Sequence, residues 1–190
     1  MLKDGMLLYH GSYAAIETID LSKCVHGKDF GKGFYLTENH EQARSFIINS
    51  IRKARNTNNI SVNQNYGFVS VFKYHKIDED ILTYSFETAD RNWLWYVSMN
   101  RRKDLAERFI NRLDERLLNA EIVIGKIAND TTNPTITAYL SGLYGDVESD
   151  SAVNFAISQL MPERLKNQFC FRTERAVKCL EKVEVLRYDH

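Results

Sequence analysis

The residue types in two short motifs near the N-terminus suit the binding of a nucleotide. One motif ends an apolar run with His10, Gly11 and Ser12, and the other is a glycine-rich segment that leads into Tyr35. His10 can hydrogen-bond a sugar hydroxyl through either ring nitrogen, and Gly11 lets a planar carboxamide approach the backbone closely. Tyr35 and Phe46 offer flat aromatic faces that attract a positively charged ring by about 1 kcal/mol each. These features match the needs of NAD, a dinucleotide with a cationic, carboxamide-bearing nicotinamide ring.

Each of these residues, taken alone, also fits a structural role. His10 can be a hydrogen-bonded histidine at a strand end, and Tyr35 and Phe46 can be core aromatics. The pair Gly31 and Gly33 is not a Rossmann fingerprint, because no third glycine follows and the next residues predict a strand instead of a helix. The functional argument therefore depends on the order and spacing of the motifs.

In order and spacing, three segments resemble the diphtheria-toxin and poly(ADP-ribose) polymerase class of the ADP-ribosyltransferase superfamily, and the chain is similar to small bacterial families allied to it. The segments are Tyr9-His10-Gly11-Ser12, Phe30-Gly31-Lys32-Gly33-Phe34-Tyr35-Leu36 and Glu41-Gln42-Ala43-Arg44-Ser45-Phe46. The resemblance implies that His10 holds the adenosine ribose and that Gly11 binds the carboxamide, with Ser12 beside it. It also implies that Tyr35 and Phe46 stack on the nicotinamide ring.

Two positions depart from the pattern of this class, which is of the H-Y-E type. Ala43 stands where the family often has a carboxamide-binding serine, with Ser45 as a less well placed substitute. Gln168 stands at the start of a late strand, where the family has its catalytic glutamate. A glutamine can hydrogen-bond a ribose 2′-hydroxyl but cannot accept a proton, and general-base assistance is commonly worth about 10²–10⁴ in rate. The resemblance therefore implies slow transfer of single ADP-ribose units without chain elongation.

Four further segments have both a functional and a structural interpretation. Glu174 is either a substitute carboxylate or an acidic residue placed by the dipole of a helix start. The pair Asn100-Arg101 can meet a diphosphate or a protein substrate, or it can form a solvated helix end. The pair Asn129-Asp130 can line the rim of a pocket or cap a turn. The Asn-rich segment 56–67 predicts an exposed loop that can cover a site.

The apolar periodicity predicts strands and helices that are interspersed along the chain. Strands are expected at 6–10, 34–36, 68–74, 81–86, 121–127, 168–172 and 183–186. Helices are expected at 40–55, 90–99, 104–119, 135–143, 151–160 and 174–180. Because the elements do not alternate regularly, an α+β fold with a mixed sheet is favoured over a doubly wound parallel sheet. The resemblance implies the ADP-ribosyltransferase-like version of that fold, a split mixed β-sheet with flanking helices.

Composition indicates a single domain over residues 1–190, with 44% hydrophobic residues. Because 25 basic residues balance 25 acidic ones, net charge gives no case for binding nucleic acid or a membrane surface. Neither a signal peptide nor an apolar run near about 18 residues is seen, so a cytoplasmic protein without a membrane partner is expected. Cys24, Cys170 and Cys179 fit buried, reduced thiols, and the five histidines lack ligand spacing, so no metal site is expected.

The leading hypothesis is an NAD-binding mono-ADP-ribosyltransferase that uses NAD as its substrate and modifies a macromolecular acceptor. By analogy, such a protein acts as a bacterial toxin or defence protein, with an antitoxin protein as a partner. One alternative, motivated by Gln168 and Ala43, is a catalytically silent module that binds NAD or ADP-ribose, or that serves protein interaction. A second alternative is phosphate transfer from RNA to NAD, which requires several basic residues that the sequence does not locate in the pocket.

Overall fold

The computed structural model describes residues 2–77, 80–128, 132–161 and 165–189, which form two β-sheets and seven α-helices. The strands are β1 (Leu7–Ser12), β2 (Phe34–Leu36), β3 (Tyr66–Tyr74), β4 (Thr83–Ser85), β5 (Ile122–Lys126), β6 (Asn167–Phe171) and β7 (Leu180–Asp189). The helices are α1 (His40–Asn56), α2 (Arg91–Arg101), α3 (Ala106–Ile110), α4 (Glu115–Leu118), α5 (Asn133–Leu140), α6 (Asp150–Leu160) and α7 (Glu174–Val177).

The strands divide into a sheet of order β1-β3-β7 and a sheet of order β2-β6-β5-β4. Neighbouring strands are antiparallel in both sheets, except that β4 and β5 run parallel. An isolated bridge between Tyr9 and Thr37 connects the edge strand β1 to the residue that follows β2. The expected α+β class with a mixed sheet is confirmed.

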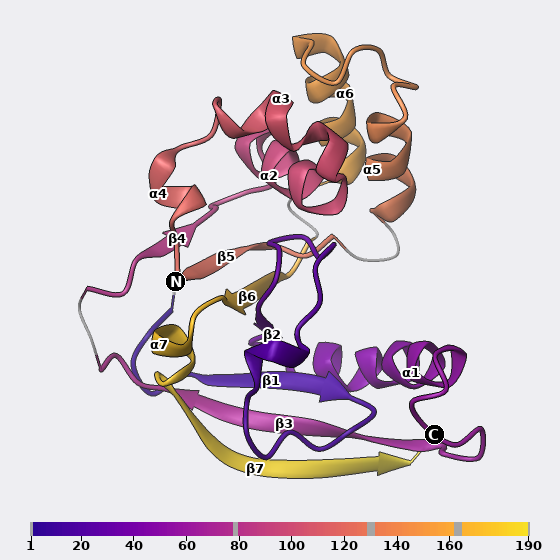
Figure 1. The fold of residues 1–190 in the computed structure, drawn as a ribbon, viewed down its shortest axis with the longest axis vertical. Helices are drawn as coiled ribbons and strands as arrows, with labels where there is room; N and C mark the ends of the chain where they lie inside the picture. Colours follow the sequence, from indigo (N-terminus) through magenta and orange to yellow (C-terminus); the bar gives the residue numbers. More distant parts are fainter. Residues whose placement is uncertain (1, 78–79, 129–131, 162–164, 190) are drawn as a thin grey trace.

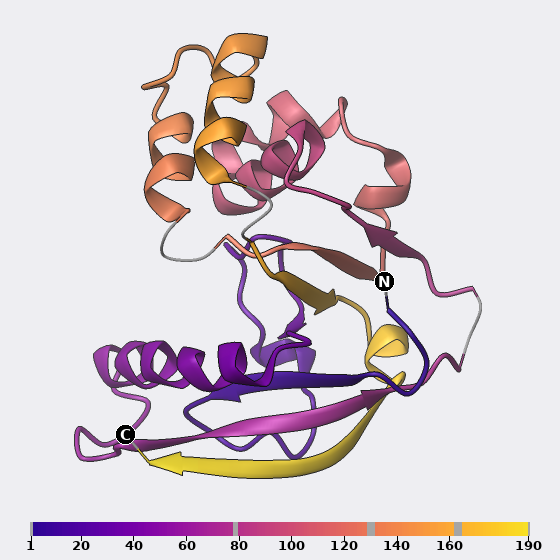
Figure 2. The ribbon, with the colours of Figure 1, turned by 180° about the vertical axis from the view of Figure 1, so that it is seen from behind.

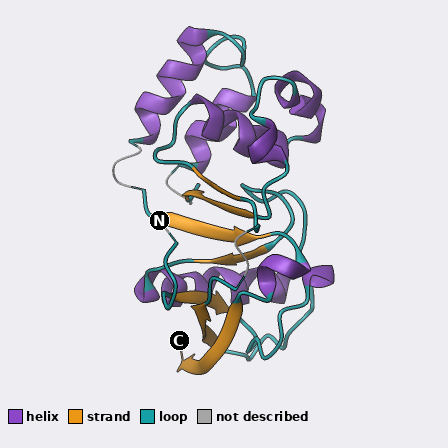
Figure 3. Cartoon of the chain, turned by 90° about the vertical axis from the view of Figure 1, so that its left-hand side faces the viewer, coloured by secondary structure: helices purple, strands orange, loops and turns teal. Residues whose placement is uncertain are grey.

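The helices are distributed unevenly over the two sheets. Helices α2 to α6 gather at one end of the molecule, beyond the four-stranded sheet, whereas α1 runs alongside β1 and β3 (Figures 1 and 2). Seen from the side, the strands of both sheets lie below this cluster of helices (Figure 3). β2 is the edge strand of the four-stranded sheet that faces β1 (Figure 1), so the second motif is held close to β1.

The two faces of the three-stranded sheet pack against different partners, because side chains alternate along a strand. Leu8 and Phe72 belong to a buried cluster shared with the four-stranded sheet. Val69 and Val71 belong to a cluster shared with α1. This alternation directs His10, which has the parity of Leu8, toward the second sheet.

Side-chain caps fix the starts of the two helices that border the site. Asn39 accepts a hydrogen bond from the backbone N–H of Gln42 at 2.8 Å, and Asp90 accepts one from Trp93 at 2.8 Å. Both caps satisfy an N–H group that the first helical turn leaves unpaired. The predicted helices at 40–55 and 90–99 are confirmed.

Among the described residues, no helix has the length and apolar character needed to cross a membrane.

The prediction of one helix over residues 104–119 is wrong. This segment forms a 3-10 turn over Lys103–Leu105 and the short helices α3 and α4. The chain breaks because the side chain of Asp114 accepts a hydrogen bond from the backbone N–H of Arg116 and so starts a new helix. Phe109 and Leu117 nevertheless remain buried, one from each piece.

Several predicted boundaries are also corrected. The last strand is longer than expected, because β7 pairs along the whole of β3. The expected strand 81–86 shortens to β4, and the expected helix 174–180 ends as α7 at Val177. The expected helix 135–143 starts earlier and ends at Leu140, before Gly142 turns the chain at a φ of +78°.

Candidate functional site

One cavity of about 980 Å³ opens between the two sheets and the face of α1. Its volume lies in the range typical of small-molecule and cofactor sites, which is about 300–1,000 Å³. Its wall comes from the end of β1, the loop before β2, β2 itself, α1, and the starts or ends of α2, α5 and β6. All six residues that the sequence analysis selected as site residues line it, namely His10, Gly11, Ser12, Tyr35, Phe46 and Gln168.

Gly11 faces α1, whereas His10 faces the four-stranded sheet on the other side of β1. A Cβ atom built on Gly11 would lie 1.8 Å from the backbone oxygen of Ala43, so no other residue fits there without moving the helix. The glycine is therefore needed to bring β1 against α1, and its backbone also lines the cavity. Ser12 is buried at this same end of the strand, where its Oγ accepts a hydrogen bond from the backbone N–H of Ala14 at 3.3 Å.

The ring of His10 is held in one tautomer. Its Nδ1 lies 2.8 Å from the backbone oxygen of Tyr35, which can only accept a hydrogen bond, so Nδ1 carries the proton. Burial lowers the pKa of His10 from its ordinary value of 6.5, and this effect exceeds the opposing effect of the Tyr35 hydrogen bond. The ring is therefore neutral at pH 7, and its Nε2 is a hydrogen-bond acceptor on the wall of the cavity.

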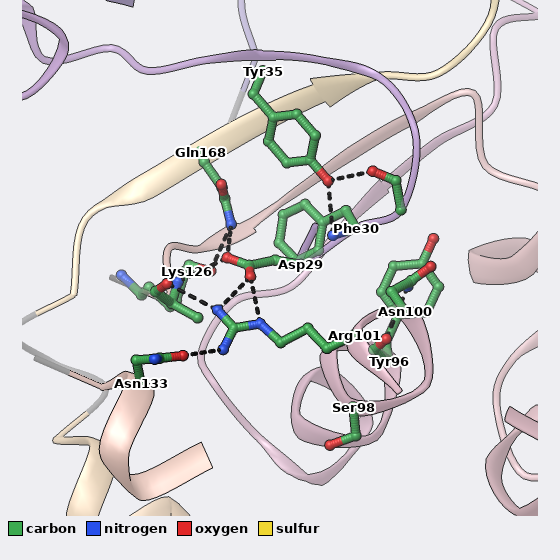
Figure 4. A network of polar contacts seen from close by, with 12 residues as sticks. Asp29, Phe30, Tyr35, Tyr96, Ser98, Asn100, Arg101, Lys126, Asn133 and Gln168 are labelled. Atoms are coloured by element: carbon green, nitrogen blue, oxygen red, sulfur yellow. Dashed lines mark hydrogen bonds and ion pairs between the residues drawn. The ribbon is translucent and has the colours of Figure 1, made fainter. Parts of the chain in front are cut away.

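Tyr35 fixes the glycine-rich loop that precedes it. Its hydroxyl donates to the backbone oxygen of Gly31 at 2.8 Å and accepts from the backbone N–H of Phe30 at 2.9 Å (Figure 4). Burial, the largest cause, raises the pKa of this hydroxyl far above its ordinary value of 10, so it stays protonated. Because both contacts hold the ring in place, Tyr35 offers the cavity a preorganised aromatic wall.

Helix α1 contributes a row of residues to the cavity at helical spacing. Ala43, Phe46, Asn49 and Lys53 all line it, and positions three and four apart share one helix face. Phe46 is 42% exposed, so its ring is open to a ligand. The ammonium group of Lys53 lies 5.9 Å from the centre of that ring.

A buried polar network surrounds Gln168, which is only 6% exposed. Its Nε2 donates to Oδ2 of Asp29 at 2.8 Å and to the backbone oxygen of Lys126 at 3.4 Å (Figure 4). The Asp29 carboxylate also accepts from Nε and Nη2 of Arg101 at 3.0 and 2.7 Å, and from the backbone N–H of Ala128 at 3.0 Å. Arg101 is further held by Asn133 at 2.8 Å.

This network sets which end of the Gln168 amide faces the cavity. Both amide hydrogens are directed to acceptors in the wall, so Oε1 is the end available to a ligand. Asp29 is 7% exposed and is paired with Arg101, whose side chain is 18% exposed. A carboxylate therefore occurs beside Gln168, the position for which the resemblance implied a glutamate, but four donors already occupy it.

The sequence analysis did not assign a role to Asp29, and for Arg101 it considered only a substrate contact or a solvated helix end. Asp29 was visible as the residue before Phe30 in the second motif, but its partners lie 72 to 139 positions along the chain. Arg101 is not a solvated helix end, because it pairs with Asp29 and lines the first cavity.

Other residues considered from the sequence lie elsewhere. Glu174 starts α7 and, with Asn100, lines a second cavity of about 760 Å³ on the other side of the glycine-rich loop. Ser45 donates to the backbone oxygen of Gln42 and is exposed, outside the lining of the first cavity. Asn129 and Asp130 lie outside the described residues.

The loop and the cysteines also differ in part from expectation. Within the segment 56–67, which was expected to cover a site, no residue lines the first cavity. The loop over residues 13–28 forms much of its wall instead. Cys170 and Cys179 are buried as predicted, whereas Cys24 is half-buried on the cavity wall.

Comparison with known proteins gives a family without an assigned activity. No curated protein and no solved structure matches the chain. The model of one protein family matches residues 6–182, a range that contains every residue lining the first cavity. The chain therefore belongs to the DUF3990 family, described as a protein of unknown function.

Proposed function

We propose that this protein is a mono-ADP-ribosyltransferase that binds NAD in the first cavity and transfers ADP-ribose to a macromolecular acceptor. The observation that supports this most is the convergence of His10, Tyr35, Phe46 and Gln168 on one cavity from four separate elements. Their order along the chain resembles that of the diphtheria-toxin and poly(ADP-ribose) polymerase class. The finer description of the fold, a split sheet of the ADP-ribosyltransferase type, is part of the same proposal.

In this proposal each residue has a separate task. The Tyr35 and Phe46 rings hold the cationic nicotinamide, because aromatic faces attract a desolvated cation. The neutral His10 ring accepts a hydrogen bond from a ribose hydroxyl through Nε2, the nitrogen left free by the contact of Nδ1 with the Tyr35 oxygen. Gln168 accepts a second ribose hydrogen bond through Oε1, the atom left free by its contact with Asp29.

The reaction breaks the bond between the nicotinamide nitrogen and the ribose carbon, and its electron pair leaves on neutral nicotinamide. The acceptor supplies the electron pair of the new bond to that carbon and releases a proton to solvent. Gln168 offers a dipole to the positive charge that develops on the ribose, but not a full negative charge. Since electrostatic stabilisation is commonly the largest catalytic contribution, we expect slow transfer of single units.

Incubation of the purified protein with radiolabelled NAD and a cell lysate tests this function. We expect labelled acceptor and released nicotinamide from the wild type, and at least about tenfold less from His10→Ala, given the worth of a buried hydrogen bond to a substrate. His26→Ala is the matched control, because His26 lines the second cavity and not the first. Label transfer that survives His10→Ala in full would contradict the proposal.

A second candidate function is a catalytically silent module that binds NAD or ADP-ribose. It is favoured by the Asp29 carboxylate, which four donors already occupy beside Gln168. The two functions differ in turnover: the module binds NAD in a His10-dependent manner and releases no nicotinamide.

A toxin role with an antitoxin partner remains part of the proposal and has its own test. Expression in a bacterial cytoplasm is expected to arrest growth, and His10→Ala is expected to relieve the arrest. Equal growth arrest by the wild type and His10→Ala would show that any toxicity does not depend on the cavity.

A further inference from the structure

The charges that line the first cavity do not balance. Among the described residues the charged groups on its wall are Asp20, Lys23, Lys28, Asp29, Lys53 and Arg101. Lys23 pairs with Asp20 at 3.7 Å, and Arg101 pairs with Asp29 at 2.7 Å. Lys28 and Lys53 form no ion pair within the part of the chain that the structure describes. The wall therefore carries two cations in excess, while the His10 ring beside them is neutral.

These two lysines act on one another. Lys28 is half-buried in the loop before β2, and Lys53 projects from α1. Burial and then the positive charge of Lys53 lower the pKa of Lys28. Two like charges that face a common cavity repel each other, and an anion between them removes that cost.

The position of Lys53 relative to the aromatic wall suits a ligand with separated parts. Phe46 and Lys53 are seven residues apart on the row of α1, which is about 10 Å along the helix axis. The Lys53 ammonium now lies 5.9 Å from the Phe46 ring, and its flexible four-carbon stem allows it to turn from that ring toward an anion. A dinucleotide whose cationic ring lies at Phe46 would therefore carry its phosphates toward Lys53, with a ribose between.

We infer that Lys28 and Lys53 form a phosphate-binding subsite of the first cavity, and that its ligand is the diphosphate of a dinucleotide. The chemistry that the subsite recognises is a compact dianion placed between two ammonium groups. This inference rests on the proposed function for the identity of the dinucleotide, but the recognition of a diphosphate stands on the two lysines alone.

The test measures dissociation constants by isothermal titration calorimetry for the wild type, Lys28→Met, Lys53→Met and the double variant. Methionine keeps the length and apolar stem of lysine and removes the charge. We expect ADP-ribose to bind about tenfold more weakly to Lys28→Met and about fivefold more weakly to Lys53→Met, which is more exposed and better screened. Nicotinamide riboside, which has no phosphate, should bind all four proteins within about twofold.

Lys32→Met is the matched control, because Lys32 lies in the same loop as Lys28 but lines the second cavity. If Lys32→Met weakens ADP-ribose as much as Lys28→Met does, the effect is general electrostatics and the subsite is refuted. Equal losses for nicotinamide riboside and ADP-ribose would refute it as well. Circular dichroism of each variant establishes that the variants are folded.

Inorganic pyrophosphate separates this inference from the proposed function. If pyrophosphate binds in a manner that depends on both lysines while NAD and ADP-ribose do not bind, the subsite stands and the proposed function fails. If NAD binds the double variant as tightly as the wild type, the subsite fails and the proposed function stands. If neither pyrophosphate nor any of the nucleotides binds, both are wrong.

Discussion

Replacing Gln168 by glutamate introduces the residue that the proposed resemblance to the ADP-ribosyltransferase class assigns to this position, yet we expect this change to destabilise the protein. Nε2 of Gln168 now donates to the Asp29 carboxylate at 2.8 Å. The substitution Gln168→Glu removes that donor and brings a second carboxylate to the same oxygen. Two unit charges at this distance repel by about 6 kcal/mol at an effective dielectric constant of about 20.

The net cost is smaller, because Arg101 attracts the introduced charge and already pairs with Asp29. We expect a loss of about 2–3 kcal/mol in the free energy of unfolding at pH 7, in line with buried like-charge pairs in one network. The loss should shrink as the pH falls toward about 5, because protonation of the introduced carboxylate removes the repulsion. NAD turnover of this variant should not exceed that of the wild type.

The double variant Asp29→Asn/Gln168→Glu exchanges the amide and the carboxylate and keeps the charge of the network. We expect it to recover most of the lost stability, since Arg101 again faces one carboxylate. It should release nicotinamide about 10²-fold faster than the wild type, because a full negative charge then faces the ribose.

The assays are urea unfolding over a pH series and chromatographic measurement of nicotinamide. Gln159→Glu is the matched control, because Gln159 is exposed on α6 and the same chemical change there should cost little. The reasoning is refuted if Gln168→Glu alone is as stable as the wild type and turns over NAD faster than the double variant does.

Three further predictions follow from the packing of the site. Gly11→Ala should lower the free energy of unfolding by about 3 kcal/mol, because the added Cβ atom would clash with the backbone oxygen of Ala43. Urea unfolding that shows a variant as stable as the wild type would contradict this prediction. Tyr35→Phe loses the hydroxyl contacts to Phe30 and Gly31, so it should lower the free energy of unfolding by about 1–2 kcal/mol and weaken NAD binding. Unchanged values in both assays would show that the Tyr35 hydroxyl does not hold the loop in place. Burial lowers the pKa of His10 from 6.5, so below about pH 6.5 the unfolded chain binds more protons than the folded protein does. The free energy of unfolding should therefore fall as the pH drops below about 6.5, and His10→Asn should make this pH dependence weaker.

The motifs led to residues that line one cavity, because these motifs are close together along the chain. His10, Tyr35 and Phe46 follow one another within 37 positions, and the two strands and the helix that carry them were predicted near their observed bounds. Gln168 required the resemblance, since one glutamine in an apolar strand carries no functional signal of its own.

What the sequence did not reveal depends on contacts between distant segments. Asp29 meets Arg101 and Gln168 only in the folded chain, because they lie 72 and 139 positions away in the sequence, so no local pattern marks it as a site residue. Gly11 was interpreted only as giving a carboxamide access to the backbone, and its close contact with Ala43, which adds a role in helix packing, was not visible in the sequence. The break at Asp114 was likewise hidden, because a capping side chain and a helical one look alike within a charged segment.

A crystal structure of the protein soaked with NAD tests the central claim most directly. The account predicts the nicotinamide ring between Tyr35 and Phe46, a ribose hydroxyl on Nε2 of His10, and the diphosphate between Lys28 and Lys53. Cleaved NAD would leave ADP-ribose with the same ribose and diphosphate contacts. The claim is contradicted if millimolar NAD leaves this cavity without ligand density or binds at another place on the protein.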